Sequence, residues 1–181
     1  MTSPHMTSPG DALLRFYRLE GPDARGRTLL EIWAWDAARL EGVHDYIQWL
    51  FPLPEPSAFN PQAPILTRET IAAFLADAQL RERLLRSLAL MLDFYGLALE
   101  SVGNGTPRIE PGPGFAARSR GWLHAGDHNH LRLTRILTSL RLLGLDDHSR
   151  ALFACLGDIA RDHPRAVSAT TLDYWRRAAG G

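Results

Sequence analysis

The sequence contains no lysine, only one cysteine and no long apolar run. Each of these features limits the classes of protein to which the chain can belong. All twenty residues counted as Lys or Arg are arginine, a bias that indicates a GC-rich, bacterial genome. Cys155 has no second cysteine to pair with, and its apolar surroundings, ALFACLG, predict a buried and inert thiol. No stretch approaches the roughly 20 apolar residues that span a bilayer, and no secretory signal is recognisable. We therefore expect a soluble, cytoplasmic protein.

The charges balance overall but are unevenly distributed. Residues 31–100 carry ten acidic residues against five arginines, whereas residues 101–141 carry six arginines and three histidines against two acidic residues. Such a division is weak support for a dedicated nucleic-acid binder, which usually has a strongly basic domain. It favours one local surface that attracts anions.

The length of 181 residues is typical of one compact domain. Residues 1–10, MTSPHMTSPG, repeat the tetrapeptide MTSP, and we interpret them as a tag remnant or a disordered start. We expect residues 11–181 to form a single domain.

Helical spacing of apolar residues predicts an all-α fold with six or seven helices. Thr28 and Glu31 form a capping-box pattern at the start of one helix, which we expect to end at Gly42. A second helix is expected to follow Thr67, to break near Asp77 and to end at Gly96. Residues 101–121 are rich in glycine and proline and predict a long loop, of the kind that is often functional.

The segment HNHLRLTRILTSLRLLG predicts an amphipathic helix that Asp127 or Asn129 caps. His128, Arg132 and Arg135 then share one face near the helix start. A helix N-terminus attracts anions, and arginine binds phosphate or carboxylate with two hydrogen bonds. The alternative is structural, with the two arginines pairing with acidic residues of the 31–100 region.

The segment HDYIQWLFPLPEPS, residues 44–57, predicts a short buried aromatic helix with a stiff, proline-rich exit. Trp49 can pack in the core or contact a ligand. His44 and Asp45 are the part of this segment that we would test as a site, although adjacent residues of a helix do not face one another.

Two alternative hypotheses use residues of the basic half of the chain, the second together with His44 and Asp45. Arg118, Arg120 and Trp122, together with the helix start at 128–135, could bind nucleic acid or a nucleotide through stacking and phosphate neutralisation. An enzyme could be built only from His44, Asp45 and His128, and no catalytic motif supports it. The histidines lack the spacing of a zinc site, so we predict neither a metal nor another cofactor.

Four segments resemble the conserved region of the opioid growth factor receptor family. They are HDYIQWLFPLPEPS, MLDFYGLALE, HNHLRLTRILTSLRLLGL and SATTLDYWRRA, and they occur in the family's order across about residues 26–178. The resemblance implies a helical domain that, in animal members, binds the pentapeptide Met-enkephalin as an opioid growth factor. Those members restrain cell proliferation at the nucleus or nuclear membrane.

We therefore expect binding of a peptide or a small, anionic ligand rather than catalysis. The ligand is predicted to lie between the HDYIQW helix, the 101–121 loop and the basic helix. The candidate ligand-binding residues are His44, Asp45, Trp49, Arg118, Arg120, Trp122, His128, Asn129, Arg132 and Arg135.

Overall fold

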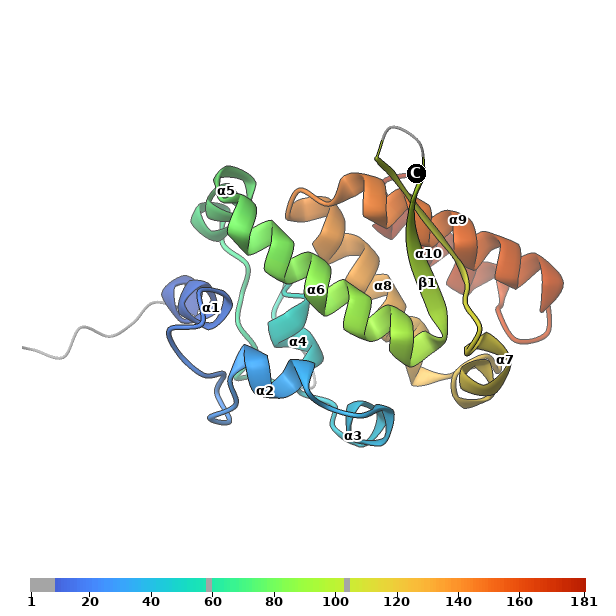
Figure 1. The fold of residues 1–181 in the computed structure, drawn as a ribbon, viewed down its shortest axis with the longest axis horizontal. Helices are drawn as coiled ribbons and strands as arrows, with labels where there is room; N and C mark the ends of the chain where they lie inside the picture. The colour runs from blue at the N-terminus through green and yellow to red at the C-terminus, as the bar shows by residue number, and fades with distance from the viewer. Residues whose placement is uncertain (1–8, 58–59, 103–104) are drawn as a thin grey trace, which may run out of the picture. The chain divides into compact units, whose positions relative to one another are not determined.

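The computed structural model describes residues 9–57, 60–102 and 105–181 (Figure 1). Within these ranges the chain forms ten α-helices, one short 3₁₀ helix (η1) and a two-stranded antiparallel sheet. The elements are α1 Pro9–Tyr17, α2 Leu29–Trp33, α3 Ala37–Gly42, α4 Ile47–Leu50, α5 Arg68–Ala76, α6 Ala78–Tyr95, β1 Leu97–Val102, β2 Thr106–Pro111, α7 Phe115–Arg118, η1 Ser119–Gly121, α8 His128–Leu142, α9 Asp146–Asp162 and α10 Ala169–Ala178.

The expectation of an all-α fold with six or seven helices is therefore wrong. Part of the expected 101–121 loop, together with the residues before it, forms a hairpin in which Leu99 pairs with Ile109. The sequence signal was the Asn-Gly pair at 104–105, which is typical of tight hairpins. Pro107 and Pro111 obscured the second strand, but a two-stranded ladder tolerates prolines because each strand has an unpaired edge.

The described chain divides into two compact units, and each is treated separately below. The N-terminal unit extends to Arg83 and the C-terminal unit covers Leu84–Gly181, so that the boundary falls inside α6. Of the ten residues interpreted as a tag or disordered start, 1–8 lie outside the described residues, and Pro9 and Gly10 begin α1. A single domain over 11–181 stays a prediction.

Side-chain caps fix the helix starts of the N-terminal unit. Thr28 and Glu31 form the predicted capping box at the start of α2, and Thr67 caps α5. The predicted break near Asp77 is confirmed, because α5 ends at Ala76 and α6 begins at Ala78. The single helix expected from Thr28 to Gly42 is instead two helices, since Asp36 accepts a hydrogen bond from a backbone amide and caps α3.

Aromatic side chains form much of the core of the N-terminal unit. Phe16 contacts the edge of Trp49 with ring centroids 5.3 Å apart, and Tyr17 contacts Phe74 at 5.0 Å. The Tyr17 hydroxyl donates to the backbone carbonyl of Leu50, which ties α1 to α4. These contacts explain why the aromatic segment around α4 is buried: its rings complete the packing around α1.

In the C-terminal unit, α8 packs against α9 and α10, and β2 packs against α9. Ser149 donates from its hydroxyl to the carbonyl of Leu137 at 2.8 Å, which joins α9 to α8. Gly96 separates α6 from β1 with a φ of +78°, as the predicted helix end requires. A Cβ at Gly96 would lie 2.7 Å from the Cα of Phe115, so the close approach of α7 also needs glycine here.

Two further expectations can be compared with the structure. Cys155 is buried, and burial raises the pKa of its thiol to about 12, in agreement with the expected inert thiol. Among the described residues, every helix is too short or too polar to cross a membrane.

Candidate functional site

Asp45 belongs to a network of charged residues in the N-terminal unit. It lies just before α4, with Oδ1 2.8 Å from Nη1 of Arg27 and Oδ2 3.1 Å from Nε of Arg25. Arg27 also donates from Nε to Oδ2 of Asp23 at 2.6 Å, and the Asp23 side chain is 0% exposed. This network was not predicted from the sequence, although an aspartate followed by arginines two and four residues later, in GPDARGR, was a usable signal.

The two arginines set the charge of Asp45. Burial alone would raise the pKa of this carboxyl, but hydrogen bonds and charge from Arg27 and Arg25 outweigh it, so the pKa lies below its usual value. A general base near neutral pH needs a raised carboxyl pKa. Asp45 is therefore suited to an ion pair and poorly suited to acid–base work. His44 precedes it on the linker after α3 and is exposed.

Trp49 lines a pocket of about 430 Å³ that lies entirely within the N-terminal unit. The indole is mostly buried by its edge-on contact with Phe16, and its remaining surface forms part of the pocket wall. The other lining residues are Ala12, Pro22, Asp23, Ala24, Pro61, Gln62, Ala63 and Pro64. Leu53 and Ile65 form an isolated parallel β-bridge, which joins two parts of the proline-rich segment.

In the C-terminal unit, Asp127 occupies the start of α8. Its carboxylate caps the helix by accepting a hydrogen bond of 2.8 Å from the backbone amide of Asn129. Asp127 was one of the two residues predicted as the cap of this helix. The Nδ1 atoms of His124 and His128 lie 3.3 and 3.8 Å from its two oxygens. The helix N-terminus, where we expected an anion, thus already has a negative side chain beside it.

The predicted residues of α8 differ in exposure. His128 is exposed and Arg135 is half-buried, but Asn129 is fully buried and Arg132 is only 5% exposed. The Arg132 guanidinium donates from Nη1 to Oδ1 of Asn129 at 3.2 Å. On this helix, His128 and Arg135 are therefore better placed than Asn129 and Arg132 to reach a ligand from solvent. Pairing of the arginines with acidic residues of 31–100 stays a prediction.

The candidates that precede α8 also separate into surface and core. Arg118, at the end of α7, lies 3.6 Å from Asp93 in an exposed ion pair, and Arg120 is exposed. Trp122 is only 1% exposed, and its Nε1 donates to the carbonyl of Tyr95 at 3.1 Å. The Trp122 ring is therefore part of the core, which argues against direct stacking on a ligand.

His130 was not among the predicted site residues, yet it occupies the aromatic centre of this unit. It lies edge-on to Trp122 and Trp175, and the Trp175 Nε1 donates to the His130 carbonyl. Burial lowers the pKa of the His130 imidazole. Polar and apolar residues alternate at the start of α8, so the sequence did not indicate that the His130 side chain would be buried.

Comparison with known proteins decides the family. The profile of the opioid growth factor receptor (OGFr) conserved region matches residues 12–179. The chain belongs to this family. The resemblance of the four segments is thus confirmed.

Relatives of the opioid growth factor receptor family include animal proteins several times longer than this chain. The opioid growth factor receptor of Rattus norvegicus is 39% identical over 149 residues, which covers 81% of this chain and 25% of the relative. The Homo sapiens receptor is 38% identical over 149 residues, 81% of this chain and 21% of the relative. Opioid growth factor receptor-like protein 1 of Mus musculus is 35% identical over 150 residues, 77% of this chain and 30% of the relative. No solved structure gives a significant match.

Proposed function

We propose that this member of the opioid growth factor receptor family is a non-enzymatic domain that binds a peptide or another small ligand through the pocket beside Trp49. The names of the rat and human relatives describe receptors for an opioid growth factor. Because the chain spans about a quarter or less of those two proteins, receptor activity is itself part of the proposal.

The observation that carries this proposal is the composition of the pocket wall. Trp49 comes from a segment typical of the family, and Pro22, Pro61 and Pro64 surround it. Small-molecule pockets of about 300–1,000 Å³ are usually apolar and preformed, with a few polar groups that orient the ligand. A wall of proline and tryptophan is also rigid, so ordering it on binding costs little entropy.

The charge of the wall restricts the type of ligand. Asp23 is the charged residue among those that line the pocket, and its carboxylate is already bound by Arg27. The pocket therefore suits an apolar or aromatic side chain rather than an isolated charge. Anion binding at His128 and Arg135 on α8 stays a separate prediction.

Titration with Met-enkephalin, followed by amide chemical shifts, tests the proposal. Ala24 is exposed and lines the pocket, whereas Ala38 is exposed on α3 outside it. Ala24→Leu should fill the pocket and weaken binding on the order of tenfold, equivalent to about 1.4 kcal/mol. Ala38→Leu is the matched control and should bind as the unaltered chain does.

Two outcomes would contradict the proposal. The first is an equal response to Met-enkephalin and to the pentapeptide of reversed sequence. The second is an Ala24→Leu variant that binds with unchanged affinity.

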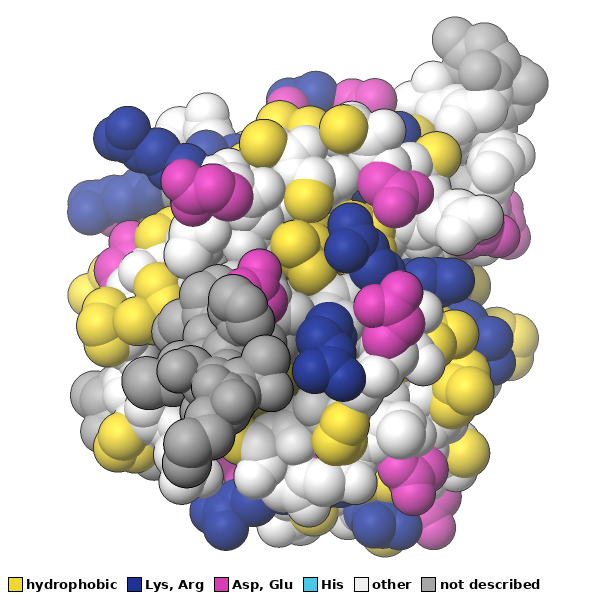
Figure 2. Space-filling view, turned by 90° about the vertical axis from the view of Figure 1, so that its left-hand side faces the viewer, with side chains coloured by type: hydrophobic (Ala, Val, Ile, Leu, Met, Phe, Trp, Pro, Cys, Tyr) yellow, Lys and Arg dark blue, Asp and Glu magenta, His cyan; other side chains and the backbone are white. Residues whose placement is uncertain are grey.

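The alternative of nucleic-acid binding has lost its stacking residue, because the Trp122 ring is in the core. Figure 2 shows a different face, toward α1 and α5, on which arginine and acidic side chains are interspersed. The enzyme alternative is also weakened, since Asp45 is held by two arginines.

A further inference from the structure

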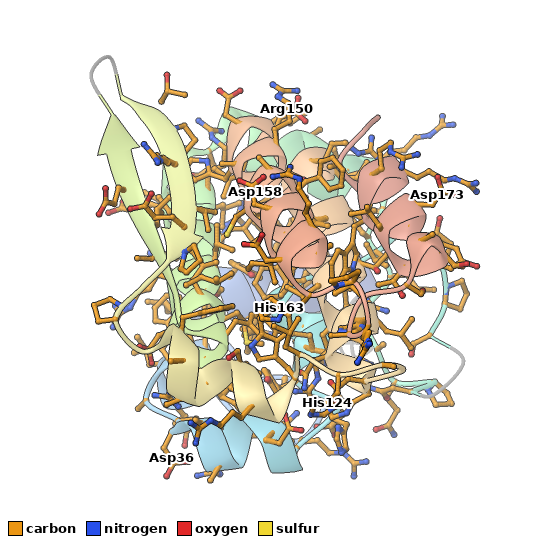
Figure 3. The ribbon with its side chains drawn as sticks, turned by 90° about the vertical axis from the view of Figure 1, so that its right-hand side faces the viewer. Asp36, His124, Arg150, Asp158, His163 and Asp173 are labelled. Atoms are coloured by element: carbon orange, nitrogen blue, oxygen red, sulfur yellow. The ribbon has the colours of Figure 1, made fainter. Side chains whose placement is uncertain are left out.

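A second concave surface lies entirely within the C-terminal unit, between α9 and α10. This groove has a volume of about 680 Å³, and its lining includes Phe153, Gly157, Val167 and Leu172. Figure 3 shows the two helices on the face toward the viewer, with Asp158 on α9, Asp173 on α10 and His163 on the segment that joins them. The groove thus combines surface from two helices and their connection.

Gly157 is unusual because nothing in its described surroundings requires glycine. It lies in the interior of α9, where glycine is unfavourable compared with alanine. It is not among the glycines with positive φ, and a Cβ added to it would meet no atom within 4 Å. The missing side chain instead deepens the groove and lets an occupant approach the α9 backbone.

The charges around the groove favour an acidic occupant. Arg161 and Arg176 line it together with one acidic residue, Asp158. The N-terminus of α10, with Ser168 as its cap, also opens into the groove and adds partial positive charge. Arg161 is paired with Asp158 and Arg176 with Asp173, each at 2.9 Å. These ion pairs are exposed and therefore weak, so both arginines can turn toward carboxylates of an occupant.

We propose that the groove between α9 and α10 binds an acidic amphipathic helix of another protein. From Phe153 to Arg161 the groove follows α9 for about 12 Å, which corresponds to about two turns of an incoming helix. Apolar residues three and four positions apart on that helix would pack over Gly157 and Leu172. Its flanking carboxylates would bind Arg161 and Arg176. This interaction is independent of the pocket beside Trp49.

A second copy of the chain fits the groove less well. In a two-fold dimer whose axis passes through this face, a concave groove would meet an identical groove and leave a void. A convex, acidic helix from a different protein avoids this void.

Fluorescence anisotropy with a labelled designed peptide tests the proposal on the full chain. The peptide is a helix of about 18 residues, long enough to be partly helical alone, with leucines on one face and glutamates beside them. A matched peptide carries lysine in place of every glutamate. The acidic peptide should bind the unaltered chain at least about tenfold more tightly than the basic peptide.

Variants of the groove then identify the surface that binds. Gly157→Phe should fill the groove and abolish binding, whereas Gly157→Ala should retain it. Arg161→Glu combined with Arg176→Glu should reverse the preference toward the basic peptide. Arg150→Glu is the control for charge, because Arg150 is exposed on α9 outside the groove. Circular dichroism verifies that each variant is folded.

The proposal is overturned if the acidic peptide fails to bind at about 0.1 mM, or binds Gly157→Phe as tightly as the unaltered chain. It is also overturned if sedimentation shows a dimer of the unaltered chain that Gly157→Phe dissociates, since the groove would then belong to a second copy. None of these results bears on Met-enkephalin binding in the N-terminal unit.

Discussion

Asp23 in the N-terminal unit and His130 in the C-terminal unit are both buried titratable groups, but only the surroundings of Asp23 provide a charged partner for the side chain. The Asp23 carboxylate accepts from the backbone amides of Arg25 and Arg27 and from the Arg27 guanidinium. The His130 imidazole is 5% exposed, and among the described residues its Nε2 has no hydrogen-bond partner. The Asp23 carboxylate is thus compensated by a cation and by backbone amides, whereas desolvation disfavours the charged form of the His130 imidazole and lowers its pKa.

This difference predicts which conditions weaken each unit. The ion pairs of the N-terminal unit are weakened by removing a partner. At Asp45, whose pKa is lowered, acid also removes stability: the contribution is complete above the unfolded-state pKa and is lost as the pH falls through the folded-state pKa. A desolvated imidazole is sensitive much nearer to neutral pH, since its ordinary pKa is about 6.5.

The largest expected effect comes from removing the partner of Asp23. Arg27→Met leaves the Asp23 carboxylate buried without its guanidinium, so the free energy of unfolding should fall by about 3 kcal/mol. Arg25→Met is the matched control: Arg25 is 64% exposed in its pair with Asp45, and its loss should cost less than about 1 kcal/mol. Urea unfolding measures both. Equal losses would show that pairing in this unit does not depend on burial.

The second effect is the pH dependence of the C-terminal unit. Burial lowers the pKa values of His130 and His148 in the folded state, so the unfolded chain binds protons first as the pH falls. Stability should therefore be complete above about pH 6.5 and should decrease below it, by at most about 1.4 kcal/mol per pH unit for each imidazole. Asp127 opposes the shift at His130 and His124 adds to it.

Hydrogen exchange of α8 amides between pH 7 and pH 5, corrected for intrinsic rates, measures this dependence. His130→Gln should reduce the slope, and the part that remains is expected from His148. A slope that does not change in His130→Gln would show that the buried imidazole takes up its proton as readily as it does in the unfolded chain.

The smallest effects come from deleting one hydroxyl in each unit. Thr28 caps α2 within a capping box, so Thr28→Ala should lower the free energy of unfolding by about 1 kcal/mol. Ser139 is fully buried on α8, and its Oγ has no partner among the described residues. Ser139→Ala should therefore be neutral or stabilise the chain by up to about 1 kcal/mol. Thermal unfolding distinguishes the two, and a loss of stability in Ser139→Ala would reveal an unrecognised partner.

The sequence predicted well those features of the fold that depend on local signals. The capping box at Thr28, the break at Asp77 and the helix end at Gly96 depend on neighbouring residues only, and each is confirmed. The helix break at residues 34–36 was missed although Asp36, which caps α3, is a local signal; the Trp35 ring within it makes a tertiary contact that the sequence does not reveal. That ring packs edge-on against Tyr46 and lies 4.4 Å from the Arg39 guanidinium.

The candidate site was harder to predict for the same reason. Asp45 was predicted as a candidate site residue, but its partners lie about twenty residues earlier, and nothing in their own spacing indicated Asp45 as the acceptor. Trp122 and Arg132 were chosen for their chemistry, which does not reveal burial. Whether they take part in binding stays a prediction, and the pocket beside Trp49 depends on segments that only folding brings together.

Gly96 also has a consequence for the natural variation of the family. Two independent constraints meet at this position, a left-handed backbone and a lack of space in which an added Cβ would lie 2.7 Å from the Cα of Phe115, and no other amino acid satisfies both. Relatives that keep the β1–β2 hairpin and α7 should therefore share glycine here however far the rest of their sequences diverge. A relative with another residue at this position should have lost or rebuilt that corner.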